Sequence, residues 1–296
     1  MMPKGEIKAR DLVLLCQRKL AQNGWQEAQA EVYLILSHVC SLHRQYLILR
    51  PEQTVSQAEA ETMNSILQRR LAGEPLAYIL GCREFMGLLF QVNKHTLIPR
   101  ADTEHLVEAC LAYITENKLK SPRILEIGSG TGCISISLKK YAKNAILESW
   151  DISKEALEVA RQNAEDLLGL EHGINFVHTD ARDLANWTAR AAGNFDLLVA
   201  NPPYIGEQEI GEIAPDVWAY EPRSAYMAEE EGYFFYRLIA EQAKSILVAN
   251  ARIFLEMGKG QQEKISQIFA KNNWDSRSLF VLKDYNQIDR VFSITP

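Results

Sequence analysis

The chain has 296 residues, of which 47% are hydrophobic and 24% are charged, and its formal net charge is −6 at pH 7. This composition predicts a globular chain with one large domain or two modest ones, and it excludes a collagen-like or disordered protein. The acidic balance argues against a protein that binds nucleic-acid phosphates non-specifically.

The five cysteines are scattered, and no pair has the C-x-x-C spacing of a metal or redox site, so we expect no metal and no disulfide framework. The N-terminal segment MMPKGEIKAR lacks the apolar core of a signal peptide. No stretch approaches the ~18 consecutive apolar residues of a membrane span. These features predict a cytoplasmic protein with no membrane partner.

Residues 1–75 are predicted to form a small helical bundle. Apolar residues recur at helical spacing over 7–20 and 28–39. A third helix is expected to start at Ser56, because Glu59 completes a capping box in which the two side chains satisfy free amides of the first turn. Gly73, followed by Pro75, is a good signal for the end of this helix.

Residues 76–100 are predicted to form a β-hairpin linker. The expected strands, 77–80 and 85–92, have strand-like composition and are interrupted by Gly81 and Gly87. A further helix is expected to begin at Asp102, Thr103 and Glu104, whose acidic and cap-forming side chains suit a helix start.

From residue 122 onward, strands and helices alternate, and residues 101–296 are assigned to one large domain. Seven strands are expected, over 123–127, 145–150, 174–178, 195–200 and 251–256 and, around a turn near Asn286, twice within 278–294. Helices are expected over 133–141, 153–167, 233–247 and 261–269. This alternation predicts an α/β fold with a doubly wound, mainly parallel sheet covered on both faces.

Three glycines, Gly128, Gly130 and Gly132, stand at alternate positions between the strand 123–127 and the helix 133–141. The carboxyl end of such a strand faces the ligand crevice of the sheet, and the following helix offers free amide groups. A dinucleotide fingerprint needs a third glycine where this chain has Cys133. The pattern G-x-G-x-G after an acidic residue instead resembles the first motif of class I methyltransferases, which bind S-adenosylmethionine.

This resemblance implies a Rossmann-like methyltransferase sheet and a set of cofactor-binding residues. Asp151, at the end of the second strand, would accept hydrogen bonds from both ribose hydroxyls, and Asp180 and Ala181 would meet the adenine. Methyltransferases of this kind often have an aromatic residue where Ala181 stands, so stacking must be weaker or come from elsewhere. A purely structural turn is the alternative, but Asp151 in register favours the cofactor. The glycine-turn residues assigned to cofactor binding are Glu126, Gly128, Ser129, Gly130, Thr131 and Gly132.

The tetrapeptide Asn201-Pro202-Pro203-Tyr204 follows the buried strand 195–200 at the same edge of the sheet. An amide nitrogen is a poor nucleophile because its lone pair is conjugated. Two oxygens could accept hydrogen bonds from its two N–H groups, and here they would be those of the Asn201 side chain and the Pro202 carbonyl. Together they would localise that lone pair and aim it at a methyl donor. The prolines stiffen the loop, and Tyr204 is expected to cover the flat face of the target. An ordinary Asn-Pro turn is the alternative.

Further segments sharpen the resemblance to the HemK family, the release-factor glutamine methyltransferases. They are GEPLAYILG (73–81), REF (83–85), LIPRADTE (97–104), KDY (283–285) and Asp289-Arg290. The resemblance implies methylation of the glutamine N5 in the Gly-Gly-Gln motif of class 1 peptide-chain release factors, with S-adenosylhomocysteine as product. It places Asn201, Pro202, Pro203 and Tyr204 on the glutamine, and Asn201 also beside the methyl donor. It further assigns recognition of the substrate protein to the bundle of residues 1–75 and methyl transfer to residues 101–296. The LIPRADTE segment would order the entrance to the site; alternatively, Arg100 and Glu104 only pair on the surface.

Three other functions stay open. A glutamine methyltransferase for a ribosomal protein shares the whole chemistry. A DNA adenine-N6 methyltransferase would need a recognition domain and a basic cleft, and this acidic chain has neither, so no nucleic-acid binding is expected. A non-catalytic adaptor that binds release factors is disfavoured by the intact Asn-Pro-Pro-Tyr loop.

Overall fold

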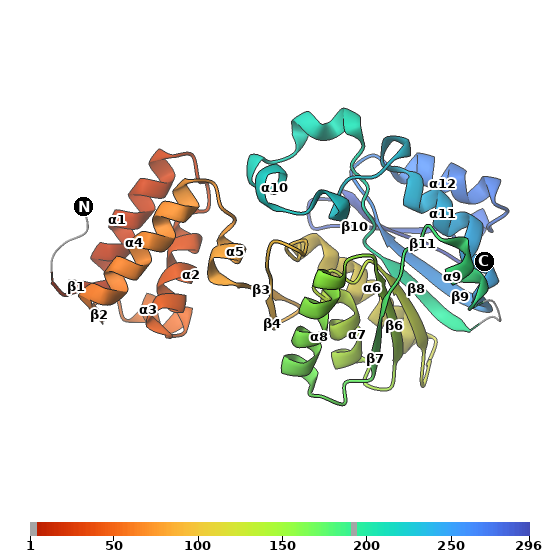
Figure 1. Cartoon of the computed structure of the whole chain (residues 1–296), viewed down its shortest axis with the longest axis horizontal. Coiled ribbons are helices and arrows are strands. Elements are labelled where there is room, and N and C mark those ends of the chain that lie inside the picture. Colours follow the sequence, from red (N-terminus) through yellow and green to blue (C-terminus); the bar gives the residue numbers. More distant parts are fainter. Residues whose placement is uncertain (1–4, 191–193) are drawn as a thin grey trace. The chain divides into compact units, whose positions relative to one another are not determined.

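The computed structural model describes residues 5–190 and 194–296, which fall into two compact units (Figure 1). The smaller unit comprises the chain up to Gly81 together with Pro215–Tyr220, and the larger unit comprises Cys82–Ala214 and Glu221–Pro296. The smaller unit is therefore discontinuous in sequence. The roles assigned above to residues 1–75, 76–100 and 101–296 stay predictions.

The smaller unit is a helical bundle whose core includes Leu12, Ile35 and Met63, from three different helices. The predicted capping box is confirmed, because the Glu59 carboxylate accepts from the Ser56 amide at 2.7 Å and the Ser56 hydroxyl accepts from the Glu59 amide. The helices are α1 (Ala9–Gln22), α2 (Ala28–Cys40), α3 (Arg44–Leu49), α4 (Gln57–Leu71), α5 (Leu76–Leu80) and α10 (Pro215–Tyr220), and the strands β1 (Ile7–Lys8) and β2 (Thr54–Val55) pair with each other.

The strand predicted over 77–80 is wrong, because this segment is the short helix α5. Pro75 stands directly before the helix with φ −56°, and Gly81 ends it in the left-handed region with φ +74°. Ile79 and Leu80 pack against the core of the bundle. The flanking residues and this packing outweigh the strand propensity of the segment.

Arg70 connects separate parts of the smaller unit. Its guanidinium donates to both carboxylate oxygens of Glu31, at 2.9 and 2.7 Å, and lies 3.5 Å from the centre of the Trp25 ring. It also pairs with Asp216 of α10 at 3.7 Å. Because Arg70 is only 6% exposed, this cluster ties α10 to the bundle although α10 lies far along the chain.

The larger unit contains a seven-stranded sheet in the order β10-β11-β9-β8-β5-β6-β7. The five strands β9, β8, β5, β6 and β7 are parallel, and β11 runs antiparallel to both β9 and β10. The strands are β5 (Arg123–Ile127), β6 (Ile146–Asp151), β7 (Ile174–His178), β8 (Phe195–Ala200), β9 (Leu247–Glu256), β10 (Phe280–Lys283) and β11 (Asp289–Ile294). The predicted doubly wound, mainly parallel α/β sheet is confirmed.

Helices cover both faces of this sheet (Figure 1). Alternate residues of a strand point to opposite faces, so Leu198 packs with α11 and α12, whereas Leu197 packs with α6, α7 and α8. The helices of this unit are α6 (Glu104–Glu116), α7 (Cys133–Tyr141), α8 (Lys154–Leu168), α9 (Leu184–Thr188), α11 (Phe234–Gln242) and α12 (Gln262–Lys271). Short 3-10 turns are η1 (Ala101–Thr103), η2 (Glu207–Glu212), η3 (Arg223–Ala225), η4 (Glu230–Gly232), η5 (Ala243–Ser245) and η6 (Ser276–Ser278).

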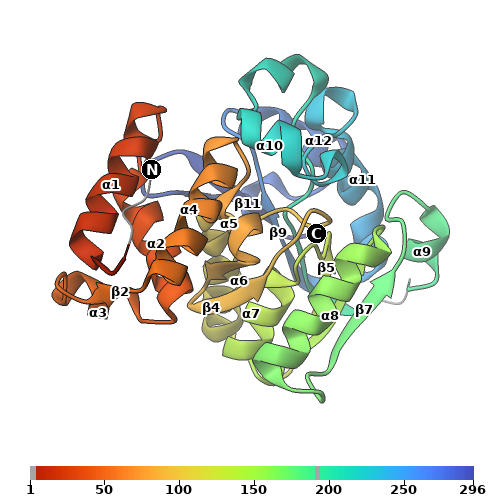
Figure 2. The same cartoon turned by 60° about the vertical axis from the view of Figure 1, so that its left-hand side comes forward.

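The predicted hairpin is present, but it is formed by β3 (Cys82–Phe85) and β4 (Leu88–Gln91). It packs beside α7 and α8 (Figure 2), and Asn163 of α8 both accepts from the Gln91 amide at 2.7 Å and donates to its carbonyl. The helix predicted over 233–247 ends earlier, because η5 and the start of β9 occupy its last part. Helices α3, α9 and α10 were not predicted.

Candidate active site

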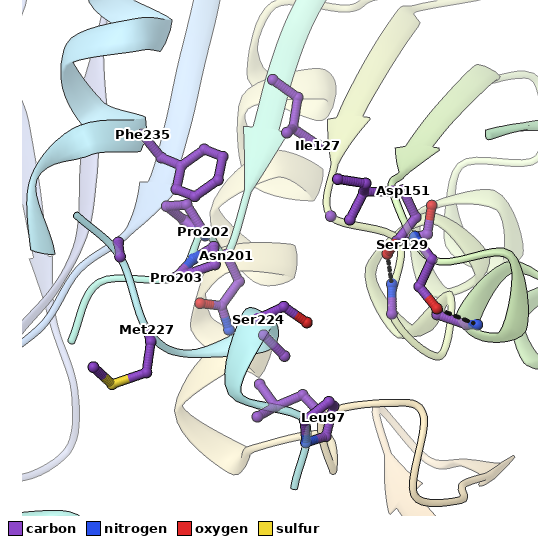
Figure 3. A pocket seen from close by; sticks show the side chains of 18 of the residues that line it. Leu97, Ile127, Ser129, Asp151, Asn201, Pro202, Pro203, Ser224, Met227 and Phe235 are labelled. Atoms are coloured by element: carbon purple, nitrogen blue, oxygen red, sulfur yellow. Dashed lines mark hydrogen bonds between the residues drawn. The ribbon is translucent and has the colours of Figure 1, made fainter. Parts of the chain in front are cut away.

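A cavity of about 660 Å³ opens at the carboxyl ends of the parallel strands in the larger unit (Figure 3). This volume lies within the ~300–1,000 Å³ of small-molecule and cofactor sites. The loops that follow β5, β6, β7 and β8 all contribute to its wall. Of the residues predicted from the sequence, the cavity is lined by Gly128, Ser129, Gly130, Thr131, Asp151, Asp180, Ala181, Asn201, Pro202 and Pro203.

The glycine turn after β5 adopts a conformation that needs glycine. Gly128, Gly130 and Gly132 all have positive φ, of +87°, +52° and +78°, which side-chain-bearing residues rarely adopt. A Cβ on Gly132 would lie 2.8 Å from the Ile136 side chain, so this glycine is needed for packing beneath the turn. Gly130 lines the cavity and has nothing within 4 Å of the same position, which leaves the backbone open to a ligand.

Glu126, predicted to contact the cofactor, does not line the cavity. Its side chain is fully buried, and its Oε2 accepts a hydrogen bond of 2.5 Å from the Ser149 hydroxyl. The Ser149 hydroxyl lies 2.6 Å from that of Ser129 in the glycine turn. Burial raises the pKa of Glu126 to about 8, so the carboxyl is largely protonated at neutral pH. Glu126 therefore supports the glycine turn through the hydroxyls of Ser149 and Ser129.

Asp151 ends β6 and faces the cavity. Its Oδ2 accepts from the Gly130 amide and its Oδ1 from the Ser153 amide, both at 2.8 Å. Burial raises the pKa of this carboxyl, although these amide hydrogen bonds oppose the shift. Each oxygen retains a lone pair for another donor. The arrangement joins the first two loops of the cavity and fits a ligand that offers adjacent hydroxyls.

Asp180 and Ala181 line the cavity after β7. The Asp180 carboxylate pairs with Arg182 at 3.0 Å, and the Ala181 carbonyl accepts from the buried Trp187 indole at 2.7 Å. The small Ala181 side chain offers no stacking surface. Apolar surface comes instead from Ile152, which is 48% exposed, and from the α11 residue Phe235, which lies beside Pro202 in Figure 3.

The Asn201-Pro202-Pro203 segment leaves β8 at the floor of the cavity, where Figure 3 places Asn201 between the two prolines and Ser224. The Asn201 Nδ2 donates to the Thr103 hydroxyl at 3.1 Å. Within the described part of the chain, no group donates to Asn201 Oδ1 or to the Pro202 carbonyl oxygen. Two acceptors at the cavity wall are therefore available to a ligand.

Tyr204, predicted to cover the target, does not line the cavity. Its ring packs with the core on the α11 side of the sheet, and burial raises the pKa of its phenol. Its carbonyl accepts from the Gln261 side chain at 2.9 Å. Gly232, with φ +90°, approaches so closely that a Cβ there would lie 2.2 Å from the Tyr204 carbonyl oxygen.

We therefore expect Gly232→Ala to displace the Asn-Pro-Pro-Tyr loop and to lower kcat by about 10²-fold, the cost of a displacement of about 1 Å at a reacting centre. Gly211→Ala is the matched control, because Gly211 is exposed and its added Cβ would meet nothing within 4 Å. Steady-state kinetics and thermal unfolding of both variants check this expectation. Equal kcat values for the two folded variants would contradict it.

Part of the cavity wall carried no signal that identified it in the sequence. The segment 222–235 contributes Pro222, Ser224, Met227, Ala228 and Phe235, among others. The LIPRADTE segment, for which a place at the entrance to the site was predicted, contributes Leu97, Pro99, Arg100 and Thr103 to the cavity wall. Arg100 pairs with the buried Glu221 at 2.5 Å, and Glu104 accepts from the Met86 amide, so an Arg100–Glu104 pair is not observed among the described residues.

The donor chemistry of the cavity fits an organic ligand. Among residues 5–190 and 194–296, no cluster of three or more histidine, cysteine or acidic side chains could hold a metal ion. No helix in the same residues is long and apolar enough to cross a membrane. The glycine turn, Asp151 and the apolar wall near Phe235 match the polar and apolar parts of a nucleoside-containing molecule.

Two family models match the chain. The PrmC N-terminal domain matches residues 11–81, and the methyltransferase small domain matches residues 105–217. A solved S-adenosylmethionine-dependent methyltransferase from Agrobacterium tumefaciens has a TM-score of 0.51 at 14% identity, covering 73% of this chain and 69% of that one. This similarity supports the methyltransferase fold.

Similar proteins align with nearly the whole chain. The release factor glutamine methyltransferase of Agrobacterium fabrum is 34% identical, with 98% of each chain covered. A bifunctional methyltransferase of Rickettsia bellii is 38% identical over 94% of this chain. The chain spans about half the length of that relative, 53%.

Proposed function

This chain belongs to the family of release factor glutamine methyltransferases, and from that premise we propose that it methylates the side-chain nitrogen N5 of the glutamine in the Gly-Gly-Gln motif of class 1 release factors. S-adenosylmethionine is the proposed methyl donor, and the cytoplasm, where release factors act, is the proposed location. The observation that carries the proposal is the pair of available oxygens at the cavity wall, Asn201 Oδ1 and the Pro202 carbonyl.

Those two oxygens suit a carboxamide NH₂ group, which has two N–H bonds to donate. Accepting both would hold the nitrogen in one orientation, with its lone pair directed at the methyl donor. The same oxygens would stabilise the positive charge that develops on nitrogen as it reacts. The stiff Pro202-Pro203 backbone keeps this geometry fixed.

The remaining lining residues suit the methyl donor. Gly128 and Gly130 would let its polar end approach the backbone, Asp151 would accept from its ribose hydroxyls, and Ile152 and Phe235 would contact its adenine. When bound, S-adenosylmethionine would supply an activated methyl group, and the electron pair of its broken C–S bond would stay on sulfur as the new N–C bond formed. The surplus proton on the amide nitrogen would then leave to water, so no residue of this chain would be required as a base.

The test is incubation of the purified chain with a bacterial class 1 release factor and methyl-labelled S-adenosylmethionine. We expect label on the Gly-Gly-Gln peptide and none when its glutamine is replaced by alanine. An unlabelled peptide, with S-adenosylmethionine nevertheless bound, would contradict the proposal and favour a non-catalytic adaptor. Label on a ribosomal-protein glutamine, or on duplex DNA, would replace release factors with the substrate concerned.

A further inference from the structure

A buried hydrogen-bond chain lies behind the Asn-Pro-Pro-Tyr loop. Asn201 Nδ2 donates to the Thr103 hydroxyl at 3.1 Å, and that hydroxyl donates to Glu256 Oε2 at 2.6 Å. Thr103 and Glu256 are each only 2% exposed. The three residues come from the end of β8, from η1 and from the end of β9, so the chain crosses three separate segments of the larger unit.

The protons available in these side chains fix the direction of each hydrogen bond between Asn201, Thr103 and Glu256. A threonine hydroxyl has one proton to donate, and an ionised carboxylate can only accept. The Thr103 hydroxyl therefore donates its hydrogen bond to Glu256, and towards Asn201 its oxygen can only accept one. The side-chain amide of Asn201 must then turn its NH₂ group toward Thr103 and its oxygen toward the cavity. The opposite rotamer would leave Thr103 and Asn201 Oδ1 facing each other as two acceptors.

We propose that Thr103 and Glu256 are positioning residues that hold the Asn201 amide with its oxygen facing the substrate. The inference rests on the proposed function, because it assigns to these residues the orientation of the acceptor for the glutamine N–H. Neither residue needs to touch substrate. An Asn201 side chain free to turn over would present NH₂ to the NH₂ of the glutamine in part of the population, and that part would be inactive.

The surroundings of Glu256 determine the conditions for a test. Burial raises its pKa to about 7, while the hydrogen bond from Thr103, the nearby Arg290 and the Asn201 side chain oppose the shift. Assays at about pH 8, one unit above that value, keep Glu256 ionised in most molecules. Among the described residues, the titratable or charged groups that interact electrostatically with it are Asp102, Cys133, Tyr204, Tyr236 and Arg290.

The kinetic test compares Thr103→Val, which keeps the shape and removes the hydroxyl, with Thr103→Ser, which keeps the hydroxyl. Loss of a buried hydrogen bond that orients a reacting group should lower kcat by roughly 10- to 100-fold in Thr103→Val. Thr103→Ser should restore most of the activity, and the S-adenosylmethionine Kd should change little in either variant. Equal loss in both variants, or wild-type kcat in Thr103→Val, would overturn the inference.

Ser137→Ala is the control for removing a buried hydroxyl. Ser137 lies in α7 outside the cavity, it is fully buried, and its hydroxyl has no partner among the described residues. Wild-type kcat is expected in this variant. A loss as large as that in Thr103→Val would assign the effect to general packing and overturn the inference.

A second measurement needs no release factor and separates this inference from the proposed function. In protein with isotope-labelled asparagine, the Asn201 side-chain NH₂, identified by its loss in Asn201→Ala, should exchange slowly in wild type and Thr103→Ser and rapidly in Thr103→Val. Slow exchange with no methylation of release factors would retain the positioning role and reject the proposed substrate. Rapid exchange in wild type would overturn the positioning role whatever the substrate.

Discussion

Replacing Asn201 by alanine is expected to lower kcat on the release factor by about 10²- to 10³-fold, the usual cost of removing one fixed polar group that stabilises developing charge. The variant loses Oδ1, one of the two available acceptors at the cavity wall, and the remaining Pro202 carbonyl can hold only one N–H of the glutamine. Binding of S-adenosylmethionine should change little, because the glycine turn and Asp151 are untouched. Turnover at saturating substrates and calorimetric titration of the donor measure the two effects separately.

Asn175→Ala is the matched control for this prediction. Asn175 is exposed on β7, and its side-chain amide donates to Glu148 at 3.1 Å. This variant should retain wild-type kcat and wild-type affinity. If Asn201→Ala instead weakened donor binding strongly and turned over normally at saturation, the acceptor role assigned to Asn201 would be wrong.

The second large effect is expected at Asp151, where alanine should weaken binding of S-adenosylmethionine by roughly 10²-fold. The carboxylate would accept from the ribose, and a hydrogen bond to a charged group contributes ~1.5–3 kcal/mol. The backbone amides of Gly130 and Ser153, which donate hydrogen bonds of 2.8 Å to Asp151, also lose their acceptor. Once the donor is saturating, kcat should recover most of its wild-type value, because the glutamine-binding oxygens remain.

Asp275→Ala separates cofactor binding from the turn itself. The Asp275 carboxylate accepts a hydrogen bond of 3.0 Å from the backbone amide of Arg277, two residues later. Asp151 accepts in the same way from the backbone amide of Ser153. Its carboxylate lies on an exposed turn and pairs with the Arg277 side chain. The donor Kd should therefore stay unchanged in Asp275→Ala. An unchanged Kd in Asp151→Ala as well would refute the ribose assignment.

The parallel sheet was predictable because its signals are local. Each strand is a short apolar run, and Gly128 to Gly132 and Asn201 to Tyr204 directly follow two of them. Carboxyl ends of neighbouring parallel strands share one edge of a sheet, so β5 and β8 bring these two motifs together. Sequence reasoning therefore located the cavity before its walls were known.

The parts that were missed depend on contacts between distant residues. Helix α5 is decided by its flanking Pro75 and Gly81 and by packing on the bundle, whereas its own residues suit a strand. Glu126 matches the expected motif, yet it is fully buried outside the cavity, where it accepts a hydrogen bond from Ser149. Thr103 and Glu256 are separated by 153 positions, and no local pattern indicates that they meet.

The discontinuity of the smaller unit limits how the protein can be dissected. Because α10 belongs with the bundle, deletion of the first 81 residues would leave Asp216 without Arg70. Helix α10 would remain in the chain between the Asn-Pro-Pro-Tyr loop and α11, both of which contribute residues to the cavity wall. Lost activity in such a truncated protein would not demonstrate that the bundle recognises the release factor, whereas point substitutions on the bundle surface would test that role.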